Sequence, residues 1–152
     1  MADSSTNVLV TTSRMPFAVD EIHKLGEAGH EVTATDTFAA APGSHSRGAA
    51  RHLVTHAPTQ ESEAFVADVV AAIERYDSGV VLPMFEEVFY LAAHRDRLEG
   101  TGAELFFPEF ATLARVHDKV SFAQLCRDLH LPVAESIVTT TDAELSSAIG
   151  RW

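Results

Sequence analysis

Four charged side chains lie at predicted junctions with the start of a helix, where a fold can present them to a ligand: Arg14, Glu86, Glu87 and Lys119. Asp118 suits a helix N-cap, because its carboxylate can accept hydrogen bonds from the free backbone N–H groups two and three residues on. Lys119 is therefore expected in the first turn of a helix. The chain has only one other lysine, Lys24. This scarcity makes Lys119 a candidate binding residue, although a solvated first-turn lysine fits the same pattern.

Adjacent carboxylates at Glu86 and Glu87 could orient an amine, a hydroxyl or a cation at a strand-to-helix turn. Acids in a first helical turn also stabilise the helix by about 0.3–1 kcal/mol with no ligand present, so both interpretations stay open. Arg14 at a helix start is either a solvated charge or an anion contact. Ser13 beside it is a helix cap rather than a nucleophile.

The elements that must hold these side chains alternate between strands and helices. A strand at 7–12, a helix at 15–28 and a strand at 31–36 form a βαβ unit, which makes a parallel strand pair. Further strands are predicted at 52–56, 79–84 and 104–107, and further helices at 61–76, 87–98 and 109–115. Residues 37–51 are predicted as an irregular connection with a helical turn at 48–51. Five β/α units complete an α/β, Rossmann-like, doubly wound parallel sheet.

The pattern changes near residue 117. A helix from Asp118 ends at Leu131-Pro132, and a strand at 134–138 and a helix from about Asp142, capped by Thr141 or Asp142, have no obvious place in the sheet. We therefore predict one domain at 1–116 and the beginning of a second at 117–152. Cys126 lies at helical spacing with apolar neighbours and is expected to be a buried small hydrophobe rather than a nucleophile.

Composition excludes several classes of function. The net charge of −11 would repel a nucleic-acid backbone, and no apolar run approaches the roughly 20 residues that span a bilayer. The first residues lack the basic start and apolar stretch of a signal peptide, so a soluble, cytoplasmic protein is expected. The single cysteine excludes an intramolecular disulfide and a thiolate metal cluster. With neither a zinc-ligand spacing nor a recognisable Ser-His-Asp set, no metal ligand or catalytic residue is assigned.

Ligands of open parallel sheets bind at the carboxyl ends of the strands. This rule selects the segments 12–14, 84–87 and 108–109 together with Asp36 as the candidate rim. The first turn reads Thr-Thr-Ser-Arg-Met-Pro and lacks the glycines that let a backbone approach a pyrophosphate. A dinucleotide site is therefore disfavoured.

The order of motifs resembles the amino-terminal part of an ATP-grasp ligase of the carbamoyl-phosphate synthase and biotin carboxylase type. The resemblance runs from about Asn7 to Glu144. The matching residues are Val8-Leu9-Val10-Thr11, Ala28-Gly29-His30-Glu31-Val32, Leu82-Pro83 with Glu86-Glu87-Val88-Phe89, Val116-His117-Asp118-Lys119 with Phe122, and Leu131-Pro132-Val133. It implies a pre-ATP-grasp domain followed by the start of an ATP-binding lobe.

The resemblance also implies roles for the candidate residues. Lys119 would contact the phosphates of ATP, and an ammonium beside helix amides is a favourable place for a polyanion. Glu86 and Glu87 would face the acceptor substrate or hold the interface to the missing lobes. Arg14 is a further candidate for substrate binding, on the ground of its position at a helix start and not of the resemblance.

Family members continue with a second lysine on a strand, a glycine-rich loop over the phosphates and acids that hold magnesium, none of which precedes Trp152. We therefore expect a fragment of an ATP-dependent carboxylate-amine or carboxylate-thiol ligase that acts through an acyl phosphate. The fragment itself is expected to be inactive and to hold no cofactor tightly, with ATP and Mg used by the full-length enzyme. Its expected partners are the missing lobes, a small-molecule carboxylate, an amine or thiol, and a second copy in a possible homodimer.

Two other functions fit the same strands. A glycosyltransferase amino-terminal domain would bind an acceptor at the same strand ends and give Lys119 no role. A free-standing sheet domain could serve as a non-catalytic binding or regulatory module, which would bind a partner without ATP.

Overall fold

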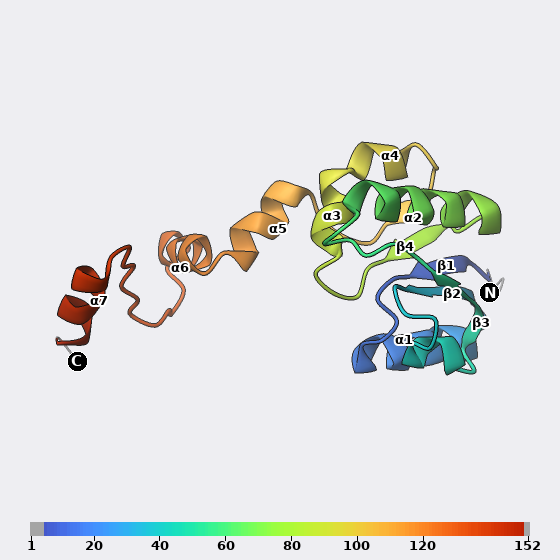
Figure 1. Ribbon diagram of the computed structural model, residues 1–152, viewed down its shortest axis with the longest axis horizontal. Coiled ribbons are helices and arrows are strands. Elements are labelled where there is room, and N and C mark those ends of the chain that lie inside the picture. The colour runs from blue at the N-terminus through green and yellow to red at the C-terminus, as the bar shows by residue number, and fades with distance from the viewer. Residues whose placement is uncertain (1–4, 151–152) are drawn as a thin grey trace. The chain divides into compact units, whose positions relative to one another are not determined.

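The computed structural model describes residues 5–150. The chain divides into two compact units, Met1–Phe110 and Ala111–Trp152, and each is described by itself (Figure 1). The domain boundary after residue 116, and the assignment of 117–152 to an ATP-grasp lobe, stay predictions.

A five-stranded sheet with the order β3-β2-β1-β4-β5 forms the centre of the first unit. All its neighbouring strands are parallel. The strands are β1 (Asn7–Val10), β2 (Glu31–Asp36), β3 (Ala49–Val54), β4 (Val80–Leu82) and β5 (Glu104–Leu105). This arrangement confirms the predicted doubly wound α/β fold, in which the order of the strands reverses next to β1.

Helices cover the two faces of this sheet (Figure 1). The α1 helix (Pro16–Glu27) and the short 3-10 helix η1 (Pro42–His45) lie on one side, and α2 (Ser62–Tyr76), α3 (Val88–Ala93) and α4 (Arg95–Glu99) lie on the other. Pro16 opens α1 with a fixed φ and no N–H to satisfy. Gly29, just past its C-cap, has the positive φ of 91° that glycine adopts without a steric penalty.

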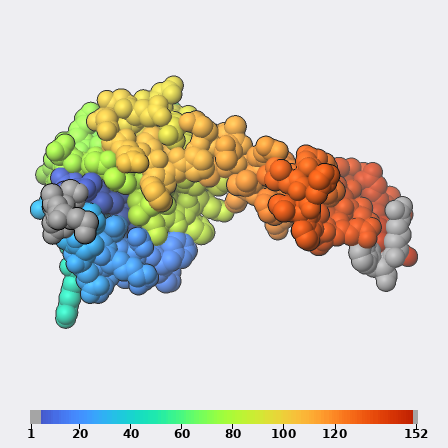
Figure 2. All heavy atoms as spheres, turned by 180° about the vertical axis from the view of Figure 1, so that it is seen from behind, coloured from blue at the N-terminus to red at the C-terminus, as the bar shows by residue number. Residues whose placement is uncertain are grey.

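Apolar strand residues alternate between the two faces. On the α1 side, a core cluster joins β1, α1 and β2: Val8, Val10, Ile22, Val32 and Ala34. The opposite side buries another set from β1, α2, β4 and α3: Leu9, Phe65, Val66, Val69, Val81 and Leu91. Figure 2 shows the first unit as one closely packed body. Covering both faces explains why the central strands β1 and β4 are continuous apolar runs rather than alternating apolar and polar ones.

The third strand lies earlier in the chain than predicted. β3 begins at Ala49, so the predicted helical turn at 48–51 is wrong and the strand predicted at 52–56 is shifted. Gly48 packs so closely on α1 that a Cβ there would lie 2.2 Å from the carbonyl oxygen of Ile22. A glycine is needed at this position because of the contact with α1, and it does not mark a loop. The edge strand β3 was hard to predict because it is half-exposed and shows no strict alternation of buried residues.

The helix predicted at 87–98 is two helices, α3 and α4. His94 separates them with φ −117° and ψ 29°, outside the helical region. The strand predicted at 134–138 is also wrong, because these residues pair with no strand in the described part of the chain. β-branched side chains favour a strand only where a sheet offers a neighbour for them.

The second unit contains most of α5 (Phe110–His117) and all of α6 (Lys119–Asp128) and α7 (Asp142–Ile149). Asp118 caps α6, as predicted, by accepting a 2.7 Å hydrogen bond from the Ser121 backbone N–H. Thr141 caps α7 in a capping box with Glu144. Cys126 is buried as expected.

Candidate functional site

The carboxyl ends of β1 and β4 are joined through Glu87, at the start of α3. Its Oε1 accepts hydrogen bonds from the Thr11 hydroxyl, from Met84 N at 2.9 Å and from Phe85 N at 3.3 Å. The residue is only 4% exposed, and its Oε2 has no hydrogen-bond partner in the described structure. Glu87 therefore holds together the ends of β1 and β4 through a contact with Thr11, which lies 76 residues earlier in the chain.

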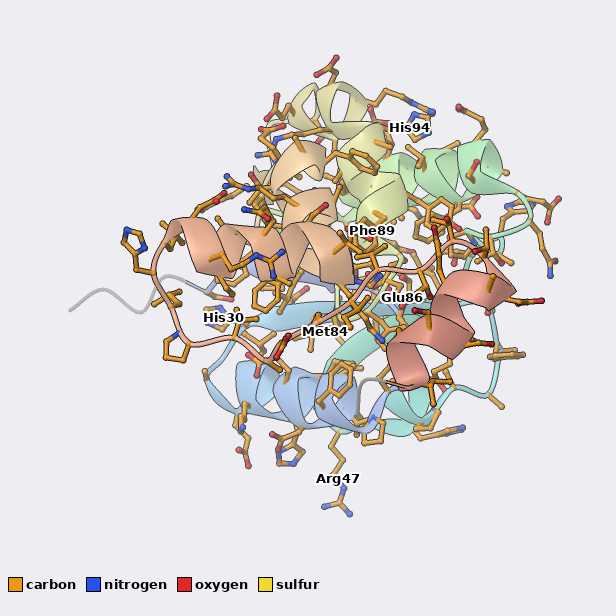
Figure 3. All side chains as sticks on the ribbon, turned by 90° about the vertical axis from the view of Figure 1, so that its left-hand side faces the viewer. His30, Arg47, Met84, Glu86, Phe89 and His94 are labelled. Carbon is orange, nitrogen blue, oxygen red and sulfur yellow. The ribbon has the colours of Figure 1, made fainter. Side chains whose placement is uncertain are left out.

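Glu86 differs from Glu87 in its exposure to solvent. Its side chain is exposed at the turn between β4 and α3, where Figure 3 labels it near Met84. The structure thus separates the predicted carboxylate pair into one buried and one exposed group. Glu86 is the one that can meet a solute directly, whereas Glu87 orders the turn that carries Glu86.

Arg14 is engaged by Asp36, at the end of β2. Its backbone N–H and Nε donate to Asp36 Oδ2 at 2.8 and 3.2 Å, and Nη2 lies 3.1 Å from Oδ1. The same Nη2 donates to the Thr37 hydroxyl at 2.9 Å, and the guanidinium lies 4.5 Å from the centre of the Phe38 ring. The Asp36 carboxylate is fully buried while the Arg14 side chain remains 35% exposed. Arg14 is thus paired with a carboxylate of the protein itself rather than with solvent alone.

The loop between β1 and α1 is shaped by packing. Thr12 has a φ of 52°, a conformation that is uncommon for a residue other than glycine. Ser13 N donates to Thr35 O, and Ser13 O accepts from Gly43 N at 2.9 Å. A Cβ at Gly43 would lie 2.4 Å from that of Ser13, so η1 closes directly over this loop. Ser13 is buried and does not cap α1 with its side chain, which makes its predicted capping role wrong.

Lys119 lies in the second unit, in the first turn of α6. It is exposed and forms no ion pair with another described residue. The pKa of the neighbouring Asp118 is lowered, chiefly because its carboxylate accepts a hydrogen bond from the Ser121 backbone N–H. Asp118 thus stays ionised and satisfies one of the free amides at this helix start, while the ammonium of Lys119 faces solvent.

Sequence reasoning missed Thr11 and the inward role of Asp36. Both are polar residues at the buried end of a strand, and a polar residue inside an otherwise apolar run is the signal that could have identified them. The remaining rim residue, Glu109, lies 2.9 Å from Arg95 Nε. Polar groups at or after the ends of β1, β2 and β4 are thus paired within the protein, Thr11 with Glu87 and Arg14 with Asp36.

Chemically, the described rim of the first unit offers the exposed carboxylates of Glu86 and Glu109, the second of them paired with Arg95, and the partly exposed guanidinium of Arg14. Over residues 5–150, no group of three His, Cys, Asp or Glu side chains is arranged to hold a metal ion. Over the same residues, every helix is too short or too polar to cross a membrane.

No family model and no curated protein matches this sequence. Solved structures do match its fold. The biotin carboxylase domain of a single-chain bacterial carboxylase is similar over 97% of this chain, with a TM-score of 0.67 and 18% identity. The ADP complex of purK, an N5-carboxyaminoimidazole ribonucleotide synthetase, matches over 97% with a TM-score of 0.66 and 18% identity. An L-amino acid ligase from Bacillus licheniformis matches over 97% with a TM-score of 0.64 and 15% identity.

These likenesses define the architecture of the chain. The chain shares the fold of a part of this biotin carboxylase domain, this synthetase and this amino acid ligase. The chain spans about a third of the length of the first of these structures, 34%, and 35% and 42% of the other two. The predicted resemblance is confirmed at the level of fold.

Proposed function

We propose that this chain forms the amino-terminal part of an ATP-dependent ligase that joins a carboxylate to an amine or a thiol through an acyl phosphate. The observation that carries the proposal is the likeness over 97% of the chain to a biotin carboxylase domain, a synthetase and an amino acid ligase. Each of these three proteins is named for a reaction that joins a carboxyl or carboxylate group to another molecule. Catalysis is assigned to the polypeptide or complex that unites this chain with the remaining ATP-grasp lobes, and not to residues 1–152 alone.

Lys119 is the proposed contact to the ATP phosphates. Its exposed ammonium lies at the start of α6, where free backbone N–H groups and the helix dipole favour an anion. Two similar structures are complexes with ADP or MgADP, which supports a nucleotide in the proposed ligase. Mg²⁺ would neutralise the charge that develops on the transferred phosphoryl group.

Glu86 is the proposed contact to the amine of the acceptor substrate, because it is the exposed carboxylate at the carboxyl end of β4. Glu87 would act by positioning that turn through Thr11 and the two backbone N–H groups. Arg14, already paired with Asp36, would offer its remaining exposed N–H groups to an anionic substrate. A second copy of the chain is a further possible partner in a homodimer, as one similar structure is a biotin carboxylase domain dimer.

The test measures ATP-dependent release of phosphate by the longest natural polypeptide that contains this chain, against panels of carboxylates with amines or thiols. Lys119→Ala is expected to raise the KM for ATP by about tenfold or more, since a charged hydrogen bond to phosphate contributes on the order of 1.5–3 kcal/mol. Lys24→Ala is the matched control, because the other lysine of the chain pairs with Asp20 on the surface of α1.

Three outcomes would overturn parts of this proposal. If Lys119→Ala left the KM for ATP and kcat unchanged, the proposed contact between Lys119 and the ATP phosphates would be wrong. If no combination of acid and nucleophile led to consumption of ATP, the ligase assignment would be wrong. Binding of a sugar nucleotide in place of ATP would favour the glycosyltransferase alternative.

A further inference from the structure

A groove of about 590 Å³ lies on the first unit, next to α1. Its floor is apolar and comes from β1 and β4, from the segments that follow β4 and β5, and from one residue of α1: Val8, Leu25, Val80, Leu82, Met84 and Phe106. Phe106 is 68% exposed. Figure 3 labels two of the lining residues, His30 and Met84.

The groove lies where a helix layer of this fold is incomplete. Parallel sheets are normally covered on both faces, and here α2, α3 and α4 cover one of them (Figure 1). On the opposite face, α1 and η1 pack on β1, β2 and β3, whereas among the helices of the first unit none lies over β4 and β5 on this side. The groove runs beside α1, on the uncovered strands.

The direction of the side chains follows from the strand register. Val80 of β4 is paired with Glu104 of β5, and paired residues of neighbouring strands point to the same face. Val80 packs against the α1-side core, so Glu104 also points to that side. Phe106, two residues on, adds an exposed aromatic ring beside it. Phe106 thus adds exposed apolar area to the floor of the groove.

Two carboxylates flank this apolar floor, Glu21 from α1 and Glu104 from β5. Within residues 5–150, neither of them forms an ion pair. An occupant that buried the floor would desolvate these acids unless it supplied cations next to them. A second copy of this chain is a poor occupant, because the chain carries a net charge of −11.

We propose that this groove is the docking site for an amphipathic helix of a partner protein, with an apolar stripe flanked by Lys and Arg. A helix fits because the uncovered strands lie beside α1, and packed helices lie about 8–10 Å apart. Its apolar side chains, spaced at i, i+3, i+4 and i+7, cover the floor. Its basic flanks pair with Glu21 on one side and Glu104 on the other. This inference does not depend on the ligase proposal.

The experiment uses a defined probe, a fluorescent helical peptide of roughly 18 residues with a leucine stripe, lysine flanks and alanine elsewhere. The matched probe has the same leucines and carries glutamate in place of lysine. Fluorescence anisotropy at physiological salt measures both against the full chain. The lysine peptide is expected to bind at least about tenfold more tightly than the glutamate peptide.

Variants locate the binding. Phe106→Asp and Glu104→Lys alter exposed groove residues, and each is expected to weaken the lysine peptide by about tenfold. Glu104→Lys is also expected to strengthen the glutamate peptide. The matched controls, Phe17→Asp and Glu74→Lys, change exposed residues outside the groove and are expected to leave both affinities within about twofold. Far-UV circular dichroism confirms that each variant remains folded.

Two results would overturn the proposal. Equal weakening by groove and control variants would mean that lysine peptides bind the acidic surface in general. A concentration-dependent dimer that dissociates in Phe106→Asp would show that a second copy of this chain occupies the groove.

Discussion

Between β1 and α4 the chain buries Leu9, Ile22 and Leu91 completely, whereas between α5 and α7 the buried side chains of the described structure are Ala123 and Cys126 alone. Burying one large aliphatic side chain contributes roughly 1.5–3 kcal/mol. The first unit gathers many such contributions from residues far apart in sequence. The second unit relies on interactions within a few residues, since Asp118 and Thr141 cap their own helices.

The contrast shows that the two units hold their functional residues differently. Glu87 is fixed by a partner from another strand, so its position depends on the whole sheet. Lys119 is fixed only by the local geometry of α6, a helix of 10 residues, and isolated helices of this length are marginal in water. The ordering of Lys119 therefore depends on what packs against α6.

The largest expected effect comes from replacing a leucine by alanine in each unit and comparing the two variants. Leu91→Ala removes a fully buried side chain of α3 and is expected to cost about 2–5 kcal/mol in the free energy of unfolding. Leu129→Ala removes a side chain that is 58% exposed and is expected to change it by less than about 0.5 kcal/mol. Urea denaturation followed by far-UV circular dichroism measures both. Equal losses would show that the second unit has a core of its own.

The adjacent carboxylates give a smaller effect within the first unit. Glu87→Ala leaves the Thr11 hydroxyl and two backbone N–H groups without their acceptor, which is expected to cost about 1–3 kcal/mol. Glu86→Ala changes an exposed side chain and is expected to cost less than about 0.5 kcal/mol. The same denaturation experiment compares them. A tolerated Glu87→Ala would show that the two strand ends are held by other contacts.

The cap of α7 tests how far local interactions stabilise the second unit. Thr141→Ala removes the side chain that accepts a hydrogen bond from Glu144 N and is expected to destabilise this helix by about 1 kcal/mol. Amide hydrogen exchange of residues 142–149 is the measurement, because the loss is local. Thr139→Ala, two residues outside the cap, is the control and is expected to leave the exchange unchanged.

The smallest expected effect is a titration on the surface of the first unit. His56 Nδ1 lies 2.7 Å from Asp68 Oδ2, and this hydrogen bond, with the negative charge of Asp68, raises the pKa of His56. A raised pKa means that the pair adds stability fully below the ordinary histidine pKa of about 6.5, and that the addition is lost as the pH rises through the folded-state value.

Proton NMR titration of the His56 ring, compared between the natural chain and Asp68→Asn, measures this effect. The midpoint is expected to fall towards the ordinary value in the variant. A midpoint that does not move would show that Asp68 leaves His56 in solution.

Much of the fold follows from the sequence, because its signals are local. β2 has the predicted bounds, and α1 and α2 differ from prediction only at their ends. The errors occur where tertiary contacts override local patterns. Gly48 is small because it contacts α1, and the β-branched residues at 137–138 lack a neighbouring strand in the described structure.

The candidate site was less predictable than the fold. Two identical residues, Glu86 and Glu87, have opposite environments because only one reaches Thr11 across the sheet. No periodicity within the chain encodes a contact between residues 76 positions apart. The capping residue Asp118 was predictable for the opposite reason, since its partner is three residues away.

The ion pair between Arg14 and Asp36 has a consequence for engineering. In sheets that bind dinucleotides, an acid after the second strand accepts hydrogen bonds from a ribose. Here the corresponding carboxylate is fully buried and accepts from Arg14 and from Phe38 N. Grafting a glycine-rich turn after β1 would therefore not convert this sheet into an NAD-binding one. The conversion also requires removal of the guanidinium, which at present keeps the ribose acceptor occupied.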